Sequence, residues 1–206
     1  MRVQVLLAAI VVATFCAASN GKHSSNNKQE WDFASNQKLE IHVTDADVNV
    51  KQSDGEKIIV ELLTQSDSTD FADKVKASFQ VQGNTGVLTV AQPPRGGDLS
   101  VTVRVPPGTS LWLRSRAGDI DIETVGNKDI QTGAGDVRVT IGSSKKFGLV
   151  DVGTHAGDVS GDVCGKPKGW VGHSLHCTGD GKDEVRVHTN AGDVQLRESA
   201  QNTEKD

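Results

Sequence analysis

Four aspartates in identical surroundings are the residues of this chain whose types and spacing could do chemistry together. Each follows an Ala-Gly pair and is followed by Ile or Val, and a Ser or Thr lies two positions before the Ala. If the four segments stack, the carboxylates form a column with a spacing of ~4.8 Å, at which neighbouring charges repel by about 1 kcal/mol even in water. The four are Asp119, Asp136, Asp158 and Asp193.

Carboxylate chemistry allows three interpretations of this column. In the first, each carboxylate accepts hydrogen bonds from peptide N–H groups of its own corner, as in an Asx-turn. The second is a calcium ladder, although the nonapeptide spacing of calcium-binding β-repeats is absent. The third is acid–base chemistry on a polysaccharide, which needs aromatic platforms and a basic residue beside the carboxylates; the tryptophans available are Trp31, Trp112 and Trp170. We favour the first interpretation and expect no catalytic residue, no metal and no cofactor.

The glycine before each aspartate predicts a corner between two β-strands. Short segments of alternating polarity flank the copies, for example residues 111–113 and 120–122, as is typical of strands. Glycine reaches positive φ without a Cβ clash, so it suits a tight corner. The corners follow one another at intervals of 17, 22 and 35 residues. This repeated unit predicts an all-β, single-domain β-solenoid of stacked coils, with structural corners at Gly118, Gly135, Gly157 and Gly192.

Composition divides the 206 residues into four parts. Residues 1–18 carry Arg2 and an apolar run too short to span a bilayer, and they predict a secretory signal peptide. A lipid on Cys16 is the alternative, which the bulky residue before it disfavours. Residues 19–38 predict a flexible spacer, residues 39–198 the β-domain, and residues 199–206 a disordered tail. The protein is therefore expected to be exported to the periplasm, cell surface or extracellular space, without stable membrane insertion after signal cleavage.

The N-terminal half of the β-domain and the residues before it allow four local structural predictions. Residues 44–50 look like a corner that lacks its glycine, and we interpret them as the terminal coil of the stack. One short helical turn is expected over residues 70–75 and a β-hairpin over residues 79–90. Trp31 and Phe33 are expected to dock on the end of the fold and protect its open edge.

Two cysteines remain after the signal peptide, Cys164 and Cys177. In an oxidising compartment they are expected to form a disulfide that fastens the glycine-rich loop between them. Two free thiols and pairing between chains are the alternatives. His173 and His176 supply further elements of a zinc site, but the spacing matches no recognised zinc framework.

The segment Val105-Pro106-Pro107-Gly108-Thr109 leads into the serial Ala-Gly-Asp corners, and with the segments 47–50 and 178–182 this arrangement resembles the bacterial putative-adhesin domain family. The resemblance covers about residues 39–197. It implies a secreted or envelope-exposed β-solenoid and brings no catalytic residues with it. The first corner, which lacks glycine, and the two cysteines depart from the family pattern.

These features favour an exported, non-enzymatic, adhesin-like structural or surface-interaction module of the bacterial cell envelope, with an unknown surface protein or glycan as its partner. A formal net charge of −5 without a basic stripe argues against nucleic acid as a partner. The sequence contains no nucleophile elbow, phosphate loop or zinc-protease motif. A carbohydrate-active β-helix enzyme or polysaccharide-binding protein is one alternative, and a scaffold of envelope signalling is another.

Overall fold

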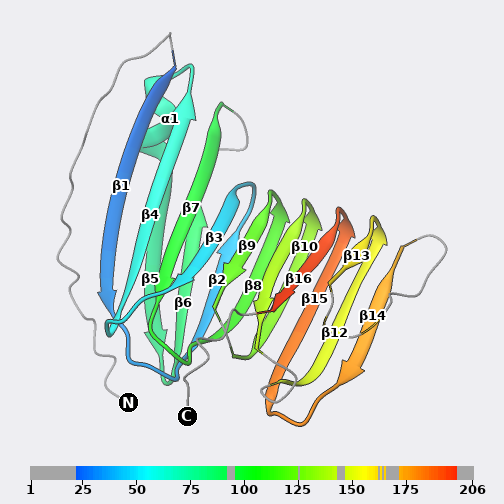
Figure 1. The fold of residues 1–206 in the computed structure, drawn as a ribbon. Helices are drawn as coiled ribbons and strands as arrows, with labels where there is room; N and C mark the ends of the chain where they lie inside the picture. The colour runs from blue at the N-terminus through cyan, green and yellow to red at the C-terminus, as the bar shows by residue number, and fades with distance from the viewer. Residues whose placement is uncertain are drawn as a thin grey trace, which may run out of the picture.

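The computed structural model describes residues 22–91, 96–124, 126–142, 147–161, 163, 165 and 172–198. Within them the chain forms β-strands and one short helix (Figure 1). In chain order the elements are β1 (His23–Asp32), β2 (Lys38–Val43), β3 (Asp47–Gln52), β4 (Lys57–Ser66), α1 (Thr69–Lys74), β5 (Lys76–Gln82), β6 (Thr85–Ala91), β7 (Asp98–Val105), β8 (Ser110–Ala117), β9 (Ile120–Glu123), β10 (Lys128–Ala134), β11 (Val137–Ile141), β12 (Phe147–Ala156), β13 (Val159–Ser160), β14 (Ser174–Thr178), β15 (Asp183–Ala191) and β16 (Val194–Glu198).

The strands form two eight-stranded sheets that enclose one apolar core (Figure 1). Sheet 1 has the order β1-β4-β7-β3-β9-β11-β16-β13, and sheet 2 has the order β14-β12-β15-β10-β8-β2-β6-β5. Alternate side chains point inward, as on β11, where Val137, Val139 and Ile141 are fully buried between half-buried polar residues. The period-2 pattern of the sequence therefore fixes which face of each strand meets the core. The all-β prediction is confirmed.

Each corner of the repeat joins a strand of sheet 2 to a strand of sheet 1. The glycine corners connect β8 to β9, β10 to β11, β12 to β13 and β15 to β16, and the glycine-free segment connects β2 to β3. Equivalent strands of neighbouring coils pair in parallel and in register, so Ala134 lies opposite both Ala117 and Ala191. The repeated motif thus identifies the coils correctly.

The coils do not stack in chain order. Both sheets place the β15–β16 coil, the last in the sequence, between the β10–β11 and β12–β13 coils. The chain passes from β12 through β13 to β14, which runs antiparallel along one side of β12, and β15 then pairs with the other side. Antiparallel pairs also occur at the opposite end, so the sheets are mixed. The stacking order thus differs from the order of the copies in the sequence, which is possible because every copy of the corner can stack on every other copy.

The glycine-free corner is not the terminal coil that the sequence predicts. Strands β2 and β3 lie inside both sheets, between the β8–β9 coil and β6 and β7. An isolated bridge joins Asp45 to Ala117, and Arg116 Nε donates to Asp45 Oδ1 at 2.9 Å. This ion pair joins the irregular corner to its neighbour. No residue in 44–50 has a positive φ, so this corner does not require a glycine.

The flexible spacer predicted over residues 19–38 is wrong for residues 23–32, which form β1. This strand pairs along its whole length with β4 and forms the edge of sheet 1. Its side chains are exposed or half-buried throughout. Apart from Trp31 its side chains are polar, so this edge strand has the composition of a linker, and most of its length is held by backbone pairing with β4.

The aromatic residues at this end dock as predicted. Phe33 is buried, and Trp31 packs against the core. Both rings contact Phe79 of β5, with centroid distances of 5.4 Å for Trp31 and 5.9 Å for Phe33. The helical turn and the hairpin are also confirmed, as α1 and the antiparallel pair β5–β6.

Several predictions fall outside the described residues: the signal peptide with Cys16, Trp170, Cys164 and the tail 199–206. Within the described part of the chain, no helix has the length and apolar character needed to cross a membrane.

Candidate functional site

The corner glycines are required both by their own backbone and by the adjacent coil. Their φ angles are 111° at Gly118, 116° at Gly135, 144° at Gly157 and 128° at Gly192. A Cβ at Gly135 would overlap with the backbone carbonyl oxygen of Gly118, and the other corner glycines face a neighbouring carbonyl in the same way. All four corner glycines therefore combine a positive φ with a backbone carbonyl where a Cβ would lie.

The corner aspartates form a ladder of hydrogen bonds between coils. The backbone N–H of Asp119 donates to Asp47 Oδ1 at 3.0 Å, and the N–H of Asp136 donates to Asp119 Oδ1 at 2.9 Å. Likewise the N–H of Asp193 donates to Asp136 Oδ1 at 3.0 Å, and the N–H of Asp158 donates to Asp193 Oδ1 at 2.8 Å. The predicted column of carboxylates is present, with Asp47 as an additional member. Asp47, Asp119, Asp136 and Asp193 each accept from the adjacent coil and not, as predicted, from their own corners.

This ladder offsets the repulsion between stacked carboxylates. A peptide N–H dipole points at each accepting oxygen, and hydrogen bonds to the charged form stabilise it. At the β13 end, Asp158 is 77% exposed in its side chain, and its Oδ1 lies 2.9 Å from His173 Nδ1. The same imidazole nitrogen lies 3.1 Å from the Gly157 carbonyl oxygen. His173 thus contacts the last carboxylate of the ladder.

The described residues hold no group of three His, Cys, Asp or Glu side chains that could bind a metal ion. His176 Nδ1 lies 3.6 Å from Asp151 Oδ1, whereas the adjacent Cys177 packs against the core and its side chain is engaged. His173 faces Asp158, as described above. The described members of the possible zinc set therefore have separate partners.

We expect Asp136→Ala to lower the free energy of unfolding by about 1 kcal/mol, because the N–H of Asp193 loses its acceptor. Asp136→Asn is the matched control, since its amide oxygen can still accept and one charge leaves the column. At low salt Asp136→Asn should equal or slightly exceed the wild type, and added salt should remove any gain. Thermal melts at two salt concentrations measure both effects. Equal melting of the Ala variant and the wild type would contradict the ladder as a source of stability.

A second arrangement of functional side chains covers the outer face of sheet 2. One row of directly opposed residues crosses six strands, each strand contributing one polar or aromatic side chain. Neighbours in the row are about one strand spacing, ~4.8 Å, apart. We call this set the Trp112 row; it consists of Glu40, Trp112, Asp129, Arg186, Asp151 and His176.

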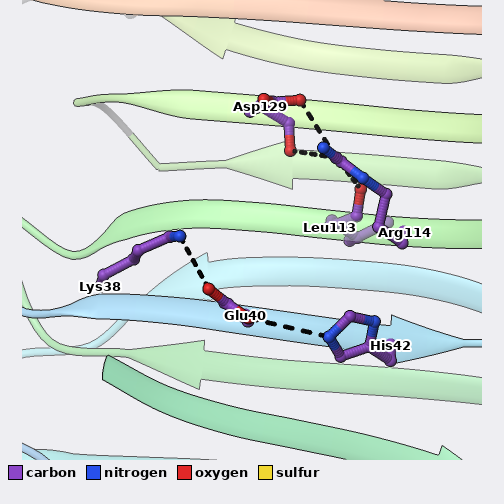
Figure 2. A network of polar contacts seen from close by, with 6 residues as sticks. All are labelled: Lys38, Glu40, His42, Leu113, Arg114 and Asp129. Atoms are coloured by element: carbon purple, nitrogen blue, oxygen red, sulfur yellow. Dashed lines mark hydrogen bonds and ion pairs between the residues drawn. The ribbon is translucent and has the colours of Figure 1, made fainter. Parts of the chain in front are cut away.

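Two cations lie over the ring of Trp112. Lys38 Nζ lies 4.6 Å from the ring centroid and Arg114 Cζ lies 4.2 Å from it. Figure 2 shows how the two are held: Lys38 Nζ donates to Glu40 at 2.7 Å, and Arg114 Nη1 donates to Asp129 Oδ1 at 3.0 Å. Cation–π contacts and ion pairs therefore fix the side chains around this half-buried ring.

A shallow depression of about 500 Å³ lies beside Trp112, where β2, β8, β10 and β15 begin. We call it the Trp112 depression. The Asn127 side chain braces its wall, because Asn127 Oδ1 accepts from the backbone N–H of Glu184 at 2.8 Å. Its lining consists of Lys38, Ser110, Leu111, Trp112, Asn127, Lys128, Asp129, Lys182, Glu184 and Arg186. A second depression, of about 660 Å³, lies at the β1 end and has a more apolar lining that includes Phe33, Ile59 and Val81.

Lys128 is the unusual residue of the Trp112 depression. It occupies an inward-facing position of β10 opposite Leu111 and Val185, and it is only 3% exposed. Its Nζ donates to the Gly126 carbonyl at 2.8 Å. Burial lowers the pKa of Lys128 from 10.5 to about 8, and the nearby Asp183 carboxylate opposes this shift. β10 thus places an ammonium group at an inward position where the directly opposed residues, Leu111 and Val185, are apolar.

We expect Lys128→Met to stabilise the domain at pH 7 by about 1–3 kcal/mol, because methionine is an unbranched apolar side chain only one atom shorter than lysine and removes a buried charge. The pKa in the folded state is depressed, so between pH 8 and 10.5 the unfolded chain binds more protons and the wild type gains stability as the pH rises. The advantage of the variant should therefore shrink over this window. Urea unfolding at pH 7 and pH 10 measures the difference, with the exposed Lys51→Met as control. A variant less stable than the wild type at pH 7 would count against this account of Lys128.

The sequence alone does not indicate the Trp112 depression. Trp112 is one of the three tryptophans available as aromatic platforms, and nothing in the sequence assigns a role to Lys38, Lys128 or Arg186. The lining residues come from four strands, and parallel pairing brings them together. The one feature of the sequence that indicates this site is Lys128, a lysine at an inward position of a strand with alternating polarity.

The fold and its corners define a class of protein: a two-sheet stack of β-coils joined by Ala-Gly-Asp corners. The model of the Toastrack DUF4097 family matches residues 36–203, so the chain belongs to the Toastrack DUF4097 family. The resemblance to adhesin-like domains predicted from the sequence is confirmed. No curated protein matches the chain.

Solved structures add likeness of fold. A crystal structure described as a putative cell adhesion protein from Clostridium sporogenes is 10% identical, covers 84% of this chain and 100% of its own, and has a TM-score of 0.51. One described as a putative adhesin from Parabacteroides merdae is 11% identical, covers 83% of this chain and 80% of its own, and has a TM-score of 0.30. Another, from Bacteroides fragilis, is 9% identical over 84% of this chain and 97% of its own, with a TM-score of 0.27. At such identities the first of these shows a shared fold, and the other two carry no argument.

Proposed function

We propose that this protein is an exported, adhesin-like surface-interaction module of the bacterial cell envelope, which binds a surface protein or glycan and catalyses no reaction. The observation that carries the proposal is the Trp112 row with its adjacent depression. Tryptophan and arginine are the side chains that most often dominate binding energy at interfaces. Here they lie together on the open face of a sheet, beside a depression that a ligand can enter.

Rigidity of this face supports recognition. The ring of Trp112 lies between ion pairs, and each strand beneath it pairs with neighbours on both sides. Side chains held in place before binding lose little conformational entropy when the ligand arrives. Rows at ~4.8 Å across the strands and about 6.6 Å along them present a regular lattice of contacts, which suits an extended or repeating ligand.

Export is the part of the proposal that rests on residues 1–18. Their composition predicts a signal peptide, and the shared fold with a structure described as a putative cell adhesion protein agrees with an exported role. Cell fractionation and the intact mass of the exported chain test this part directly. A cytoplasmic chain that retains residues 1–18 would sink it.

The favoured binding experiment combines a glycan and cell-surface protein array with incubation on whole polysaccharides. We expect binding without chemical change, and we expect Trp112→Ala to weaken it by about tenfold or more while the melting temperature stays near that of the wild type. Release of reducing ends or unsaturated products would favour the alternative, a carbohydrate-active enzyme. If Trp112→Ala leaves binding unchanged, the ligand binds another surface of the domain. That result would favour the alternative of an envelope-signalling scaffold.

A further inference from the structure

We propose that the Trp112 depression binds the anionic groups of an acidic polysaccharide, either carboxylates or sulfates. This inference rests on the proposed function, because it names the class of ligand for the same surface. It commits to one occupant on grounds of charge complementarity, which the following observations establish.

The charges that line the depression are unlike those of the whole chain. Two carboxylates, those of Asp129 and Glu184, face four cations. The chain as a whole carries a formal net charge of −5. Just outside the lining, Glu40 pairs with Lys38 and Asp183 lies near Lys128, so the attraction for an anion rests on the cations that have no carboxylate within ion-pair distance. The four cations are Lys38, Lys128, Lys182 and Arg186.

Two of these cations already have a carboxylate partner, and two have none in the described part of the chain. Lys38 pairs with Glu40 at 2.7 Å, and Arg186 pairs with Glu184 at 2.9 Å. Lys182 is exposed beside the depression and makes no ion pair with a described residue. Among those residues Lys128 Nζ has one hydrogen-bond acceptor, a backbone carbonyl, and no carboxylate within ion-pair distance. An ammonium has three N–H donors, so Lys128 can still donate to a ligand.

Lys128 is the residue of the depression whose charge an anion would stabilise most, because its side chain is buried. Removing a charge from water is costly unless an opposite charge and hydrogen bonds compensate. The partial loss of its proton near neutral pH, which its lowered pKa implies, agrees with incomplete compensation in the free protein. A ligand carboxylate or sulfate at the mouth of the depression would supply the missing charge.

Trp112 holds the positive charge in place before a ligand arrives. Its ring faces Lys38 and Arg114 at 4.6 Å and 4.2 Å, so both cations are held beside Trp112, and Lys38 lines the depression. The indole also presents an apolar surface beside these charges. Charged groups next to apolar C–H faces are the chemical signature of an acidic sugar, which pairs a carboxylate or sulfate with a pyranose ring.

The test uses three probes that share one backbone: dextran, carboxymethyl dextran and dextran sulfate, each added to the full exported chain at about 0.15 M salt, where weak surface attraction is screened. We expect affinity electrophoresis to show binding of the charged dextrans and none of dextran. The arm that binds more tightly identifies carboxylate or sulfate as the preferred group. Lys182→Ala and Arg186→Gln should each weaken binding by about fivefold to tenfold. Arg104→Gln is the matched control for Arg186→Gln, because it breaks a similar ion pair on sheet 1. Lys51→Ala removes a lysine of sheet 1 and is the control for Lys182→Ala; both controls should leave binding unchanged.

A pH series gives an independent readout. The Lys128 ammonium faces the charged groups of the depression and Asp183, and raising the pH from 7 to 9 removes its proton. Binding by the wild type should therefore weaken over this range more than binding by Lys128→Met, which should already be weaker at pH 7. An identical pH profile for the two proteins would remove Lys128 from the site and overturn the inference.

The remaining outcomes separate this inference from the proposed function. If the array finds a neutral glycan or a protein partner whose binding needs Trp112, and the charged dextrans do not bind, the acidic-ligand inference falls and the proposed function stands. If Arg104→Gln weakens binding as much as Arg186→Gln, the attraction is non-specific and the inference falls. If neither array nor dextran detects any ligand, both fall.

Discussion

Gly135→Val is expected to destabilise the domain by more than about 3 kcal/mol, and to lower its melting temperature by about 6–12 °C or prevent folding. Gly135 has φ 116°, where a β-branched side chain is strained. Its Cβ would also overlap with the Gly118 carbonyl oxygen, a backbone atom that cannot move without breaking the pairing of two coils. Because the backbone strain and the steric overlap affect the same corner, a shift of the backbone that relieves one does not relieve the other.

Three other glycines of this chain separate the two causes. Gly83 has positive φ and open space around it, whereas Gly133 has no positive φ but faces the Arg116 carbonyl oxygen. Gly55 has neither constraint. Substitution by valine at Gly55 should change stability little, substitution at Gly83 or Gly133 should cost an intermediate amount, and substitution at Gly135 should cost most. Equal melting temperatures within a degree or so across the four variants would disprove the role of the corner.

The corner motif is the part of the fold that the sequence predicts best, because its chemistry is local. A glycine at positive φ and an aspartate that needs a donor can be recognised in six consecutive residues. The order of coils could not be predicted in this way. It depends on β14, which runs antiparallel beside β12, so that β15 pairs with the other side of β12 and with β10. The sequence does not indicate this order, because all corner copies offer the same stacking surface.

The partners of the ladder carboxylates were mispredicted for a related reason. An aspartate in a turn most often accepts from its own segment, and a single sequence gives no distance to the next coil. In the structure the N–H of Asp136 lies within 2.9 Å of Asp119 Oδ1, 17 residues earlier in the chain. A hydrogen bond between coils requires the stacking to be known first.

The candidate binding surface was harder still to predict. Trp112 and Asp129 are directly opposite each other only because β8 and β10 pair in parallel in this register, and a shift of one residue would turn one of them inward. The polar strand β1 shows the same limit at the other end. Its composition is that of a linker, and its place in the sheet comes from backbone pairing with β4.

The second large effect is expected from the cysteines: we predict that Cys164 and Cys177 form a disulfide, and that its loss costs about 3 kcal/mol. Cys177 lies on β14, the edge strand of sheet 2, and packs against the core with an engaged side chain. Val163 packs against the same core. Cys164 itself lies outside the described residues. A bond that closes a loop of about 14 residues removes about this much free energy from the unfolded chain.

The location of β14 makes the expected loss partly local. Among the described strands β14 pairs with β12 alone, so without the disulfide its five residues are held by one neighbouring strand and a few core contacts. Edge elements of this kind open before the rest of a domain. We therefore expect the double variant Cys164→Ser, Cys177→Ser to melt about 6–12 °C below the wild type, and hydrogen exchange to rise first in residues 174–178. Reduced wild type is the matched control and should melt with the double variant. Alkylation of the unreduced, folded, exported chain decides the pairing: one intact mass without adducts supports the bond, whereas two alkyl adducts on a monomer would exclude it.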